Sequence, residues 1–414
     1  MLKRLNISPK TLYYSLLVVL GFWLLSLKQR QAGGIDDLNV FYKAGERLMQ
    51  HQDIYGPPHF YNLKYFYSVL FASFMALFQG FGIDVVKWIW FVLNTALLMR
   101  VLLILQQHVF KQDNKQALYL LILAFLMVKV IMANFTYNQI TIWMLWLMLE
   151  AFVLFQKQRY MLGIVLLCVG INIKLLPMVM VPYLLWSYPN SLKHLLFGCV
   201  LLLLLYILPA LWLGFDYNLF LFKSWWQTLN PVSDVHTLQT YEYGLMDLSA
   251  AISKFLSAEQ VYLEPDLHIA NLSTNALFVL VNGIRIGLLC MAVHIGVRCK
   301  QSMFGVPHQL MVFAAFMALI PLCFPHQREY SYLLLMPMLS IQLKCLFESR
   351  QKALLLCFVG LIIASGVWVW KDVFGEAALN WVNHHRVLTY ASIGLFMTYY
   401  AMLLASDKTS KGAE

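Results

Sequence analysis

The sequence predicts an all-α, polytopic integral membrane protein, and three observations carry this prediction. Of its 414 residues, 61% are hydrophobic and only 12% are charged, whereas an average soluble domain carries about 25% charged residues. The chain contains a series of apolar stretches, many of which approach the roughly 20 residues that a helix needs to cross a bilayer. Its seven cysteines lie in or beside these stretches without any C-x-x-C spacing. These features exclude a soluble enzyme and a secreted disulfide scaffold.

The apolar stretches predict the membrane helices in chain order. Regular helices are expected near residues 11–27, 84–105, 117–133, 139–156, 194–213, 274–297, 308–323, 330–346, 353–370 and 387–404. Residues 160–186 are expected to form a broken pair of short helices that turns near Lys174, because Pro177 prevents a regular helix there. Residues 63–81 are expected to enter the membrane without a net crossing. The chain then crosses about twelve times as a single membrane domain over residues 1–414.

The placement of charges orients these helices. With the N-terminus inside, short cytoplasmic segments collect half of the 30 basic residues, and most acids fall on outer segments, as the positive-inside bias requires. A full crossing by residues 63–81 would move the basic loops outside and is therefore disfavoured. The net charge of +10 is thus an orientation signal, and nucleic acid is excluded as a partner. Both termini are expected in the cytoplasm.

Two outer segments are long enough to carry a functional site, because every other connection is short. The first covers residues 28–62 and the second residues 214–273. Aromatic residues and one acid of the second segment indicate either an acceptor-binding surface or an interfacial helix: Trp225, Trp226, Tyr241, Glu242 and Tyr243.

The first outer segment contains a short amphipathic helix. In the run LNVFYKAGERLMQ, the apolar residues Val40, Phe41, Ala44 and Leu48 share one helical face, which suits a helix at the membrane surface. Asp37 stands where the N-cap of this helix would be, a role worth about 1 kcal/mol to the helix. Capping and catalysis are compatible roles for this acid.

Lys174 stands in the apolar run GINIKLLPM. A lysine at the bilayer centre costs about 2.5 to 3.5 kcal/mol on insertion scales, so such residues tend to face a partner or a cavity. An outward-facing cavity would suit an anion such as a lipid phosphate, with Lys129 and Arg285 as further cations. The alternative is a lysine that snorkels at the turn between two half-helices. Glu150 is expected to neutralise either Arg100 or Arg285.

Residues 325–330 form an outer turn with more polar groups than capping requires. His326 would orient an acceptor hydroxyl, and Arg328 would pair with a phosphate through its planar fork. The alternative for each is a solvated turn. His384 and His385 form another outer pair, but without further ligands they do not make a metal site.

Several segments occur in an order that is found in one known family. They are Asp37-Leu-Asn-Val-Phe-Tyr-Lys-Ala, Tyr55-Gly-Pro-Pro, Asn138-Gln139-Ile-Thr141, Leu162-Gly163 through Lys174-Leu-Leu-Pro177, and Glu329-Tyr330-Ser-Tyr-Leu-Leu-Leu-Met-Pro337. In this order, over about residues 11–345, the chain resembles glycosyltransferase family 87 of the GT-C superfamily of membrane glycosyltransferases. It departs from the family pattern at Tyr330 and Ser331, where many members have a His pair, and at Thr141, where they have Asn. The Pro-Pro pair is also separated from its apolar helix by residues 59–64.

The resemblance implies a GT-C-type fold and an inverting transfer on the outer face, from a polyprenyl-phosphate donor that usually carries mannose. Inverting transfer needs one carboxylate general base near the acceptor hydroxyl, and a departing lipid phosphate needs cations. Asp37 is the candidate base. The candidates for substrate binding are Asp36, which is also the less favoured substitute for the base, together with Lys174, His326, Arg328 and Glu329.

The resemblance also implies the partners and the location. The expected partners are the lipid-linked donor, a lipid or glycan acceptor, and membrane lipids. No cofactor and no divalent metal are expected, because a monoanionic leaving phosphate does not demand one. The expected location is the plasma membrane, or the inner membrane of a bacterium, with the site on the outer, periplasmic side. The alternative function is a lipid-linked glycan flippase, transporter or polymerase, and a detectable internal repeat would favour transport.

Overall fold

The computed structural model describes Gly21 and residues 36–56, 63–111, 115–188, 190–229, 244–257, 269–299, 301–349 and 351–411, with Trp186, Asp372 and residues 406–411 described by backbone alone. These residues are helical with turns between the helices, and they contain no β-strand. The all-α prediction is therefore confirmed. The helix predicted near residues 11–27 lies outside the described residues, except for Gly21.

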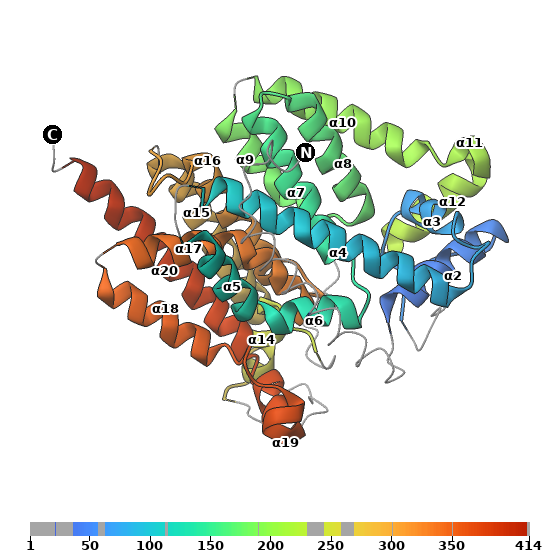
Figure 1. Ribbon diagram of the computed structural model, residues 1–414. Coiled ribbons are helices and arrows are strands. Elements are labelled where there is room, and N and C mark those ends of the chain that lie inside the picture. Colours follow the sequence, from blue (N-terminus) through green and yellow to red (C-terminus); the bar gives the residue numbers. More distant parts are fainter. Residues whose placement is uncertain are drawn as a thin grey trace. The chain divides into compact units, whose positions relative to one another are not determined.

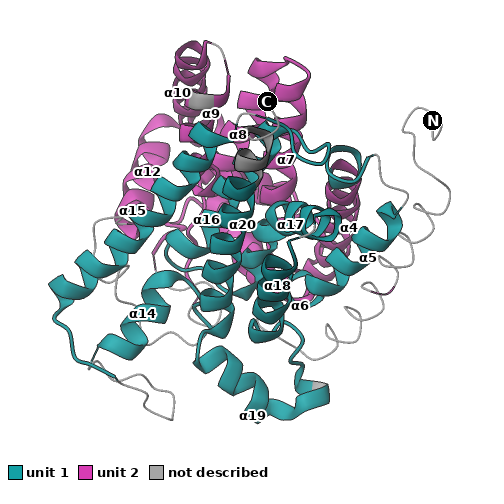
Figure 2. Cartoon of the chain, turned by 90° about the vertical axis from the view of Figure 1, so that its left-hand side faces the viewer, with its two compact units in different colours: residues 1–18, 105–131, 232–414 teal, residues 19–104, 132–231 magenta. Residues whose placement is uncertain are grey.

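The chain divides into two compact units, shown in different colours in Figure 2. Unit 1 consists of residues 1–18, 105–131 and 232–414, and unit 2 of residues 19–104 and 132–231. Each unit therefore combines segments that are distant in the sequence, and each is described by itself below.

Unit 2 contains helices from the N-terminal part of the chain, from α2 to α12 (Figure 1). They are α2 (Asp37–Met49), α3 (Val69–Ala76), most of α4 (Ile83–His108), α7 (Thr141–Gln156), α8 (Tyr160–Ile173), the 3-10 helix η2 (Leu176–Val179), α9 (Met180–Ser187), α10 (Ser191–Ile207), α11 (Ala210–Leu213) and α12 (Phe215–Leu229). The interior helix is α7, which packs against α8 and buries side chains on several faces, such as Ile142, Met144 and Leu149.

Unit 1 is built around a buried segment. Its elements are α5 (Gln116–Leu126), the first part of α6 (Val128–Thr136), α14 (Leu248–Leu256), α15 (Thr274–Arg298), α16 (His308–Cys323), the 3-10 helix η3 (Glu329–Leu335), α17 (Met336–Glu348), α18 (Lys352–Ala364), α19 (Lys371–His384) and α20 (Val387–Lys411). Nearly every side chain of α16 and of η3–α17 is buried. These elements form the core on which α15 and α20 pack.

Five of the ten predicted regular helices are present at the expected positions. The stretches 84–105, 139–156, 274–297, 308–323 and 387–404 correspond to α4, α7, α15, α16 and α20. The broken pair at residues 160–186 is confirmed, because α8 ends at Ile173 and η2 begins at Leu176. Within 63–81 the helix α3 has only 8 residues, or about 12 Å of length, so it cannot cross a bilayer core of about 30 Å.

Four predicted helices differ from the structure. The stretch 117–133 is two helices, α5 and α6, bent by 59°. The stretch 194–213 is interrupted at Pro209, which has no N–H to continue the helical hydrogen bonds. The stretch 330–346 begins as the 3-10 helix η3. The stretch 353–370 ends at Ala364, shortly before Gly366 takes a positive φ of 69°, a conformation outside the helix region.

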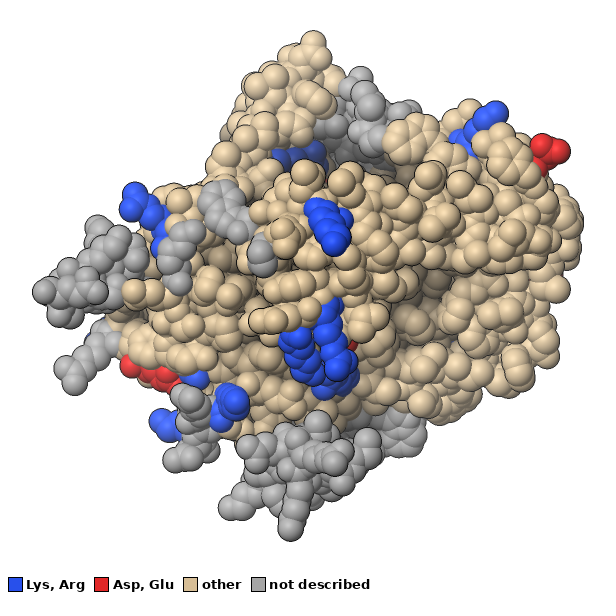
Figure 3. Space-filling model, turned by 90° about the horizontal axis from the view of Figure 1, so that it is seen from above, with Lys and Arg blue, Asp and Glu red and all other residues tan. Residues whose placement is uncertain are grey.

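The apolar helices indicate a membrane protein. Five described helices are long and apolar enough to cross a membrane, and the bent pair α5–α6 would be a sixth. The predicted number of about twelve crossings is therefore not confirmed. Many large hydrophobic side chains are exposed, among them Leu196, Val200 and Leu203 on α10, and the face in Figure 3 is mostly uncharged, with Lys and Arg in small groups. Lipid is the solvent that suits such a surface.

Arg100 on α4 and Glu150 on α7 form a bidentate ion pair. Nε and Nη2 of Arg100 donate to the two carboxylate oxygens of Glu150, each at 2.7 Å. Since α4 is a candidate membrane span, each charge alone would be costly. Of the two partners expected for Glu150, Arg100 is thus confirmed. Arg285 instead donates to Asn282 Oδ1 and Ser249 Oγ.

We expect Arg100→Leu to lower the free energy of unfolding by about 3 to 5 kcal/mol, because it leaves Glu150 without its counter-charge in an apolar setting. The double variant Arg100→Leu/Glu150→Leu should recover most of this loss, since it removes both charges together. Thermal unfolding in detergent micelles measures both. A double variant as unstable as Arg100→Leu would show that the pair itself does not matter.

The predicted amphipathic helix of the first outer segment is present as α2, but its apolar face packs inside the protein. Leu38, Val40, Phe41, Ala44 and Leu48 are all at most 3% exposed. The helix packs against α3. The apolar face of α2 is therefore used for tertiary packing, and the prediction that this helix lies at the membrane surface is not confirmed.

Gly45 permits the close approach of α2 and α3. A Cβ at this position would stand 2.7 Å from the backbone nitrogen of Ala76 and 2.8 Å from the carbonyl carbon of Met75. Both neighbours are backbone atoms, so relief would require the helices to separate.

We expect Gly45→Ala to destabilise the protein by about 1 to 3 kcal/mol through this overpacking. Gly80→Ala is the matched control in the same unit, because a Cβ there meets nothing within 4 Å. Unfolding midpoints of the two variants measure the difference. Equal midpoints would mean that α2 and α3 are free to move apart.

Candidate active site

Asp36 and Asp37 stand at the start of α2, and their surroundings differ. Asp36 is the N-cap: its Oδ1 accepts hydrogen bonds from the backbone nitrogen of Asn39 at 3.0 Å and from Asn39 Nδ2 at 2.9 Å. Its Oδ2 lies 2.9 Å from Lys87 Nζ, and its side chain is only 6% exposed. The prediction that Asp37 occupies the cap position was wrong, because α2 begins one residue earlier than its apolar pattern indicates.

Asp37 is the first residue of α2, and the turn before α7 holds it in place. Its N–H donates to the carbonyl of Tyr137 at 3.0 Å. The amide Nε2 of Gln139 donates to Asp37 Oδ2. The Asp37 side chain is partly exposed, whereas Asp36 is buried. A carboxylate that is oriented and still reachable is the kind of group that can accept a proton from a substrate.

The turn that holds Asp37 is itself fixed by neighbouring helices. Asn138 has a positive φ of 48°, which asparagine tolerates better than most residues. Its carbonyl accepts a hydrogen bond from Trp90 Nε1 at 3.0 Å, and the N–H of Gln139 donates to Asn134 O at 2.9 Å. Gln139 was not among the predicted site residues. The available signal was its place in the family-like Asn138-Gln139 segment.

Lys174 lies where α8 ends. Its backbone is extended, and its N–H donates to the carbonyl of Gly170 at 2.9 Å. Its ammonium nitrogen lies 5.8 Å from the centre of the Tyr67 ring, a distance typical of a cation–π contact. The carboxylate of Asp37 interacts electrostatically with this ammonium group. Unit 2 therefore places a general-base candidate and a cation in one electrostatic neighbourhood.

Side chains between α2 and α3 support Tyr67 and the end of α8. Tyr55 donates its hydroxyl to the Tyr67 carbonyl at 2.8 Å, and burial raises the pKa of Tyr55 well above its ordinary value, so it remains a neutral donor. Ser68 caps α3 and donates to Asn172 Oδ1 at 2.8 Å. The Asn172 Nδ2 group is buried with no hydrogen-bond partner among the described residues.

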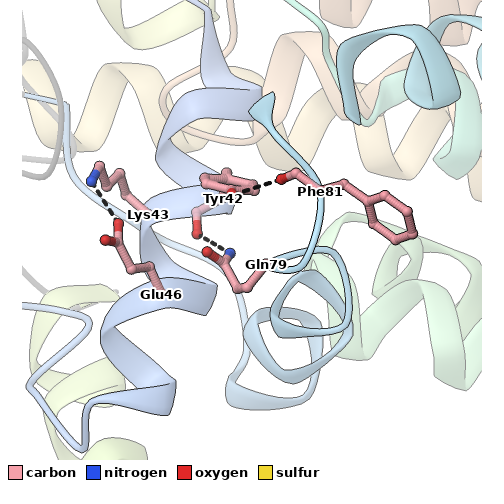
Figure 4. A network of polar contacts seen from close by, with 5 residues as sticks. All are labelled: Tyr42, Lys43, Glu46, Gln79 and Phe81. Carbon is pink, nitrogen blue, oxygen red and sulfur yellow. Dashed lines mark hydrogen bonds and ion pairs between the residues drawn. The ribbon is translucent and has the colours of Figure 1, made fainter. Parts of the chain in front are cut away.

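A second set of contacts joins the middle of α2 to the turn after α3 (Figure 4). The hydroxyl of Tyr42 donates to Phe81 O at 2.9 Å, and Gln79 Nε2 donates to Tyr42 O at 2.8 Å. Both contacts fasten α2 to the turn after α3. The nearby Lys43–Glu46 pair, at 2.5 Å, is exposed and contributes little, as such surface pairs do.

The remaining predicted binding residues lie in unit 1. His326 has a positive φ of 58° in the turn after α16. The backbone of Arg328 forms an isolated antiparallel β-bridge with the backbone of Leu245. Glu329 opens η3, and its carboxylate lies 3.9 Å from Lys129 Nζ. Lys129, expected as a further cation, therefore pairs with a predicted site residue. The predicted residues thus form two groups, one in each unit.

The comparisons with known proteins add one finding. A family model for glycosyltransferase family 87 matches residues 65–325, well over half of the 414 residues. The matched range contains Gln139 and Lys174, begins after Asp37 and ends just before His326. No curated protein and no solved structure matches the chain.

Proposed function

The chain belongs to glycosyltransferase family 87, and from this premise we propose that it transfers a sugar, mannose in the first instance, from a polyprenyl-phosphate donor to a lipid or glycan acceptor. The transfer takes place at the outer face of the membrane and inverts the anomeric configuration. The family and the apolar helices together indicate a membrane glycosyltransferase. The donor, the sugar, the side of the membrane and the residue roles are the proposal.

The residue roles rest on one observation: the two adjacent acids, Asp36 and Asp37, have different contacts and different exposure. Asp36 is occupied by the cap and by Lys87, at 3.0 Å and 2.9 Å. Asp37 is oriented by Gln139 and remains partly exposed. Asp37 is therefore assigned as the general base, which removes the proton from the acceptor hydroxyl as that oxygen attacks the anomeric carbon.

The leaving group is the second requirement of the reaction. As the new bond between the acceptor oxygen and the anomeric carbon forms, the bond from that carbon to the phosphate oxygen breaks, and the lipid phosphate departs with its negative charge. Lys174 is assigned to stabilise this charge, and the Tyr67 ring fixes its position. A fixed cation at the developing charge is the type of group that contributes most to such steps.

The group in unit 1 is assigned to substrate binding. Arg328 has the planar fork that suits a phosphate, and His326, two residues earlier in the same turn, is assigned to the acceptor because an imidazole can orient a hydroxyl. Glu329, at the start of η3, pairs with Lys129 of α6 and is assigned to hold this cation near the turn. These roles follow from residue chemistry within unit 1.

The test is transfer by the purified full-length chain in liposomes. The liposomes receive polyprenyl-phosphate mannose labelled in the sugar, together with extracted membrane lipids as acceptors. The expected result is a new labelled glycoside whose anomeric configuration is opposite to that of the donor. Movement of intact donor between leaflets without a new glycoside would favour the flippase alternative. Transfer from another polyprenyl-phosphate sugar, but not from mannose, would correct the sugar alone.

A further inference from the structure

Helix α12 carries a feature that the transfer reaction does not use. It begins at Phe215, directly after the span Ser191–Leu213 and after Gly214, which has a positive φ of 82°. Glycine adopts this conformation at little cost, so the chain changes direction at the end of the span. The next 15 residues form one continuous helix.

One face of α12 is fixed to unit 2. Its buried residues Asn218, Leu221 and Trp225 follow a spacing of three and four residues, so they share one side of the helix. Asn218 Nδ2 donates to Tyr206 O at 3.1 Å, and Trp225 Nε1 donates to Phe66 O at 3.1 Å. The orientation of α12 about its own axis is therefore settled.

A second face is apolar and exposed. Its members, called the exposed stripe here, recur at helical spacing: Phe215, Leu219, Phe222 and Trp226. Phe215 is 63% exposed and Trp226 56%. At about 100° per residue, these side chains fall within one narrow sector beside the buried face. The exposed polar residues Asp216, Lys223 and Gln227 fall in another sector, roughly opposite the buried face, with Phe220, 47% exposed, at its edge farther from the stripe.

We propose that α12 lies in the membrane–water interface, with the exposed stripe in the lipid and the polar sector in water. Lipid is chosen because the stripe continues the apolar surface of the preceding span, where Leu211 is 81% exposed and Trp212 51%. A helix with an apolar sector beside a charged one lies in the interface plane, where Trp is favoured. A second copy of the chain is the competing occupant.

If α12 lies in the interface, its contacts also fix the position of α2 relative to the lipid. Tyr217 donates its hydroxyl to Gln52 O at 2.6 Å, and α12 packs on α3, which in turn packs on α2. The helix therefore couples the depth of α2 to the lipid surface. Under the proposed function, this coupling sets the height of Asp37 above the lipid headgroups. The lipid contact itself does not depend on any transfer activity.

The test compares adjacent positions of α12 in the full-length chain. A small fluorescent amino acid is incorporated at position 222 or 226 in the exposed stripe, or at 223 or 227 in the polar sector as matched controls. Each protein is reconstituted in phosphatidylcholine–phosphatidylglycerol vesicles. The label is quenched either by nitroxide-bearing lipid, with the nitroxide near the headgroup, or by iodide in the water.

The expected result is strong lipid quenching and weak iodide quenching at 222 and 226, with the reverse at 223 and 227. Equal iodide quenching at all four positions would place the stripe in water and overturn the proposal. Protection of 222 and 226 from both quenchers would place protein, such as a second copy, on the stripe and overturn it as well. Because the readout needs no substrate, its outcome is separate from that of the transfer assay.

Discussion

Asp37→Asn is expected to lose sugar transfer by about 10²- to 10⁴-fold, the range that a positioned general base contributes. Asparagine keeps the size and the polar contact of the side chain but cannot take up the acceptor proton. The loss should appear in kcat with little change in the unfolding midpoint. Steady-state transfer in liposomes, together with thermal unfolding of the same preparation, measures both quantities.

Asp36→Asn is the matched control for this variant. Asparagine is as good an N-cap as aspartate, so the start of α2 is retained, and only the ion pair with Lys87 is lost. We expect transfer within a few-fold of wild type and a modest loss of stability. If Asp36→Asn loses transfer while Asp37→Asn retains it, the two roles are reversed, and Asp36 would be the base.

Lys174→Met is expected to lower kcat/KM for the lipid donor by about 10²- to 10³-fold, in line with the removal of one fixed group that stabilises developing charge. Stability should be unchanged or raised, because methionine fills similar space without the cost of a charge in apolar surroundings. This opposite movement of activity and stability distinguishes a phosphate-binding lysine from a snorkelling one. The measurements are donor-dependent transfer rates and unfolding midpoints.

Lys43→Gln is the control for loss of a positive charge in the same unit. Lys43 pairs with Glu46 on the exposed side of α2, where such pairs contribute little. It should leave transfer and stability near wild type. Full transfer by Lys174→Met would show that Lys174 serves only as the polar end of α8.

The helices could be predicted from the sequence because length and apolar character are local properties. The run Ile83–His108 is apolar along its length, and Pro177 interrupts the segment after α8 wherever the rest of the chain lies. The 59° bend between α5 and α6 has no Pro or Gly at the break, so the local sequence did not predict the bend.

The candidate site could be predicted only in part. The acids at the start of α2 and the lysine in its apolar run are visible as residues in unusual places. Which acid caps the helix depends on backbone angles one residue apart. Gln139 stands 102 positions from Asp37 in the sequence, so its contact with Asp37 arises from the packing of α2 beside the turn before α7.

The sequence alone indicated that the chain is helical, belongs in a membrane, and carries two adjacent acids before an amphipathic helix and a lysine in an apolar run, because composition and periodicity express these properties directly. The tertiary structure settled what covers each face. The apolar faces of α2 and α12 have similar sequence patterns, yet α3 covers the face of α2 and leaves the exposed stripe of α12 bare. The periodicity of a sequence predicts which residues share one face of a helix. Whether another helix or lipid covers that face depends on how distant segments pack.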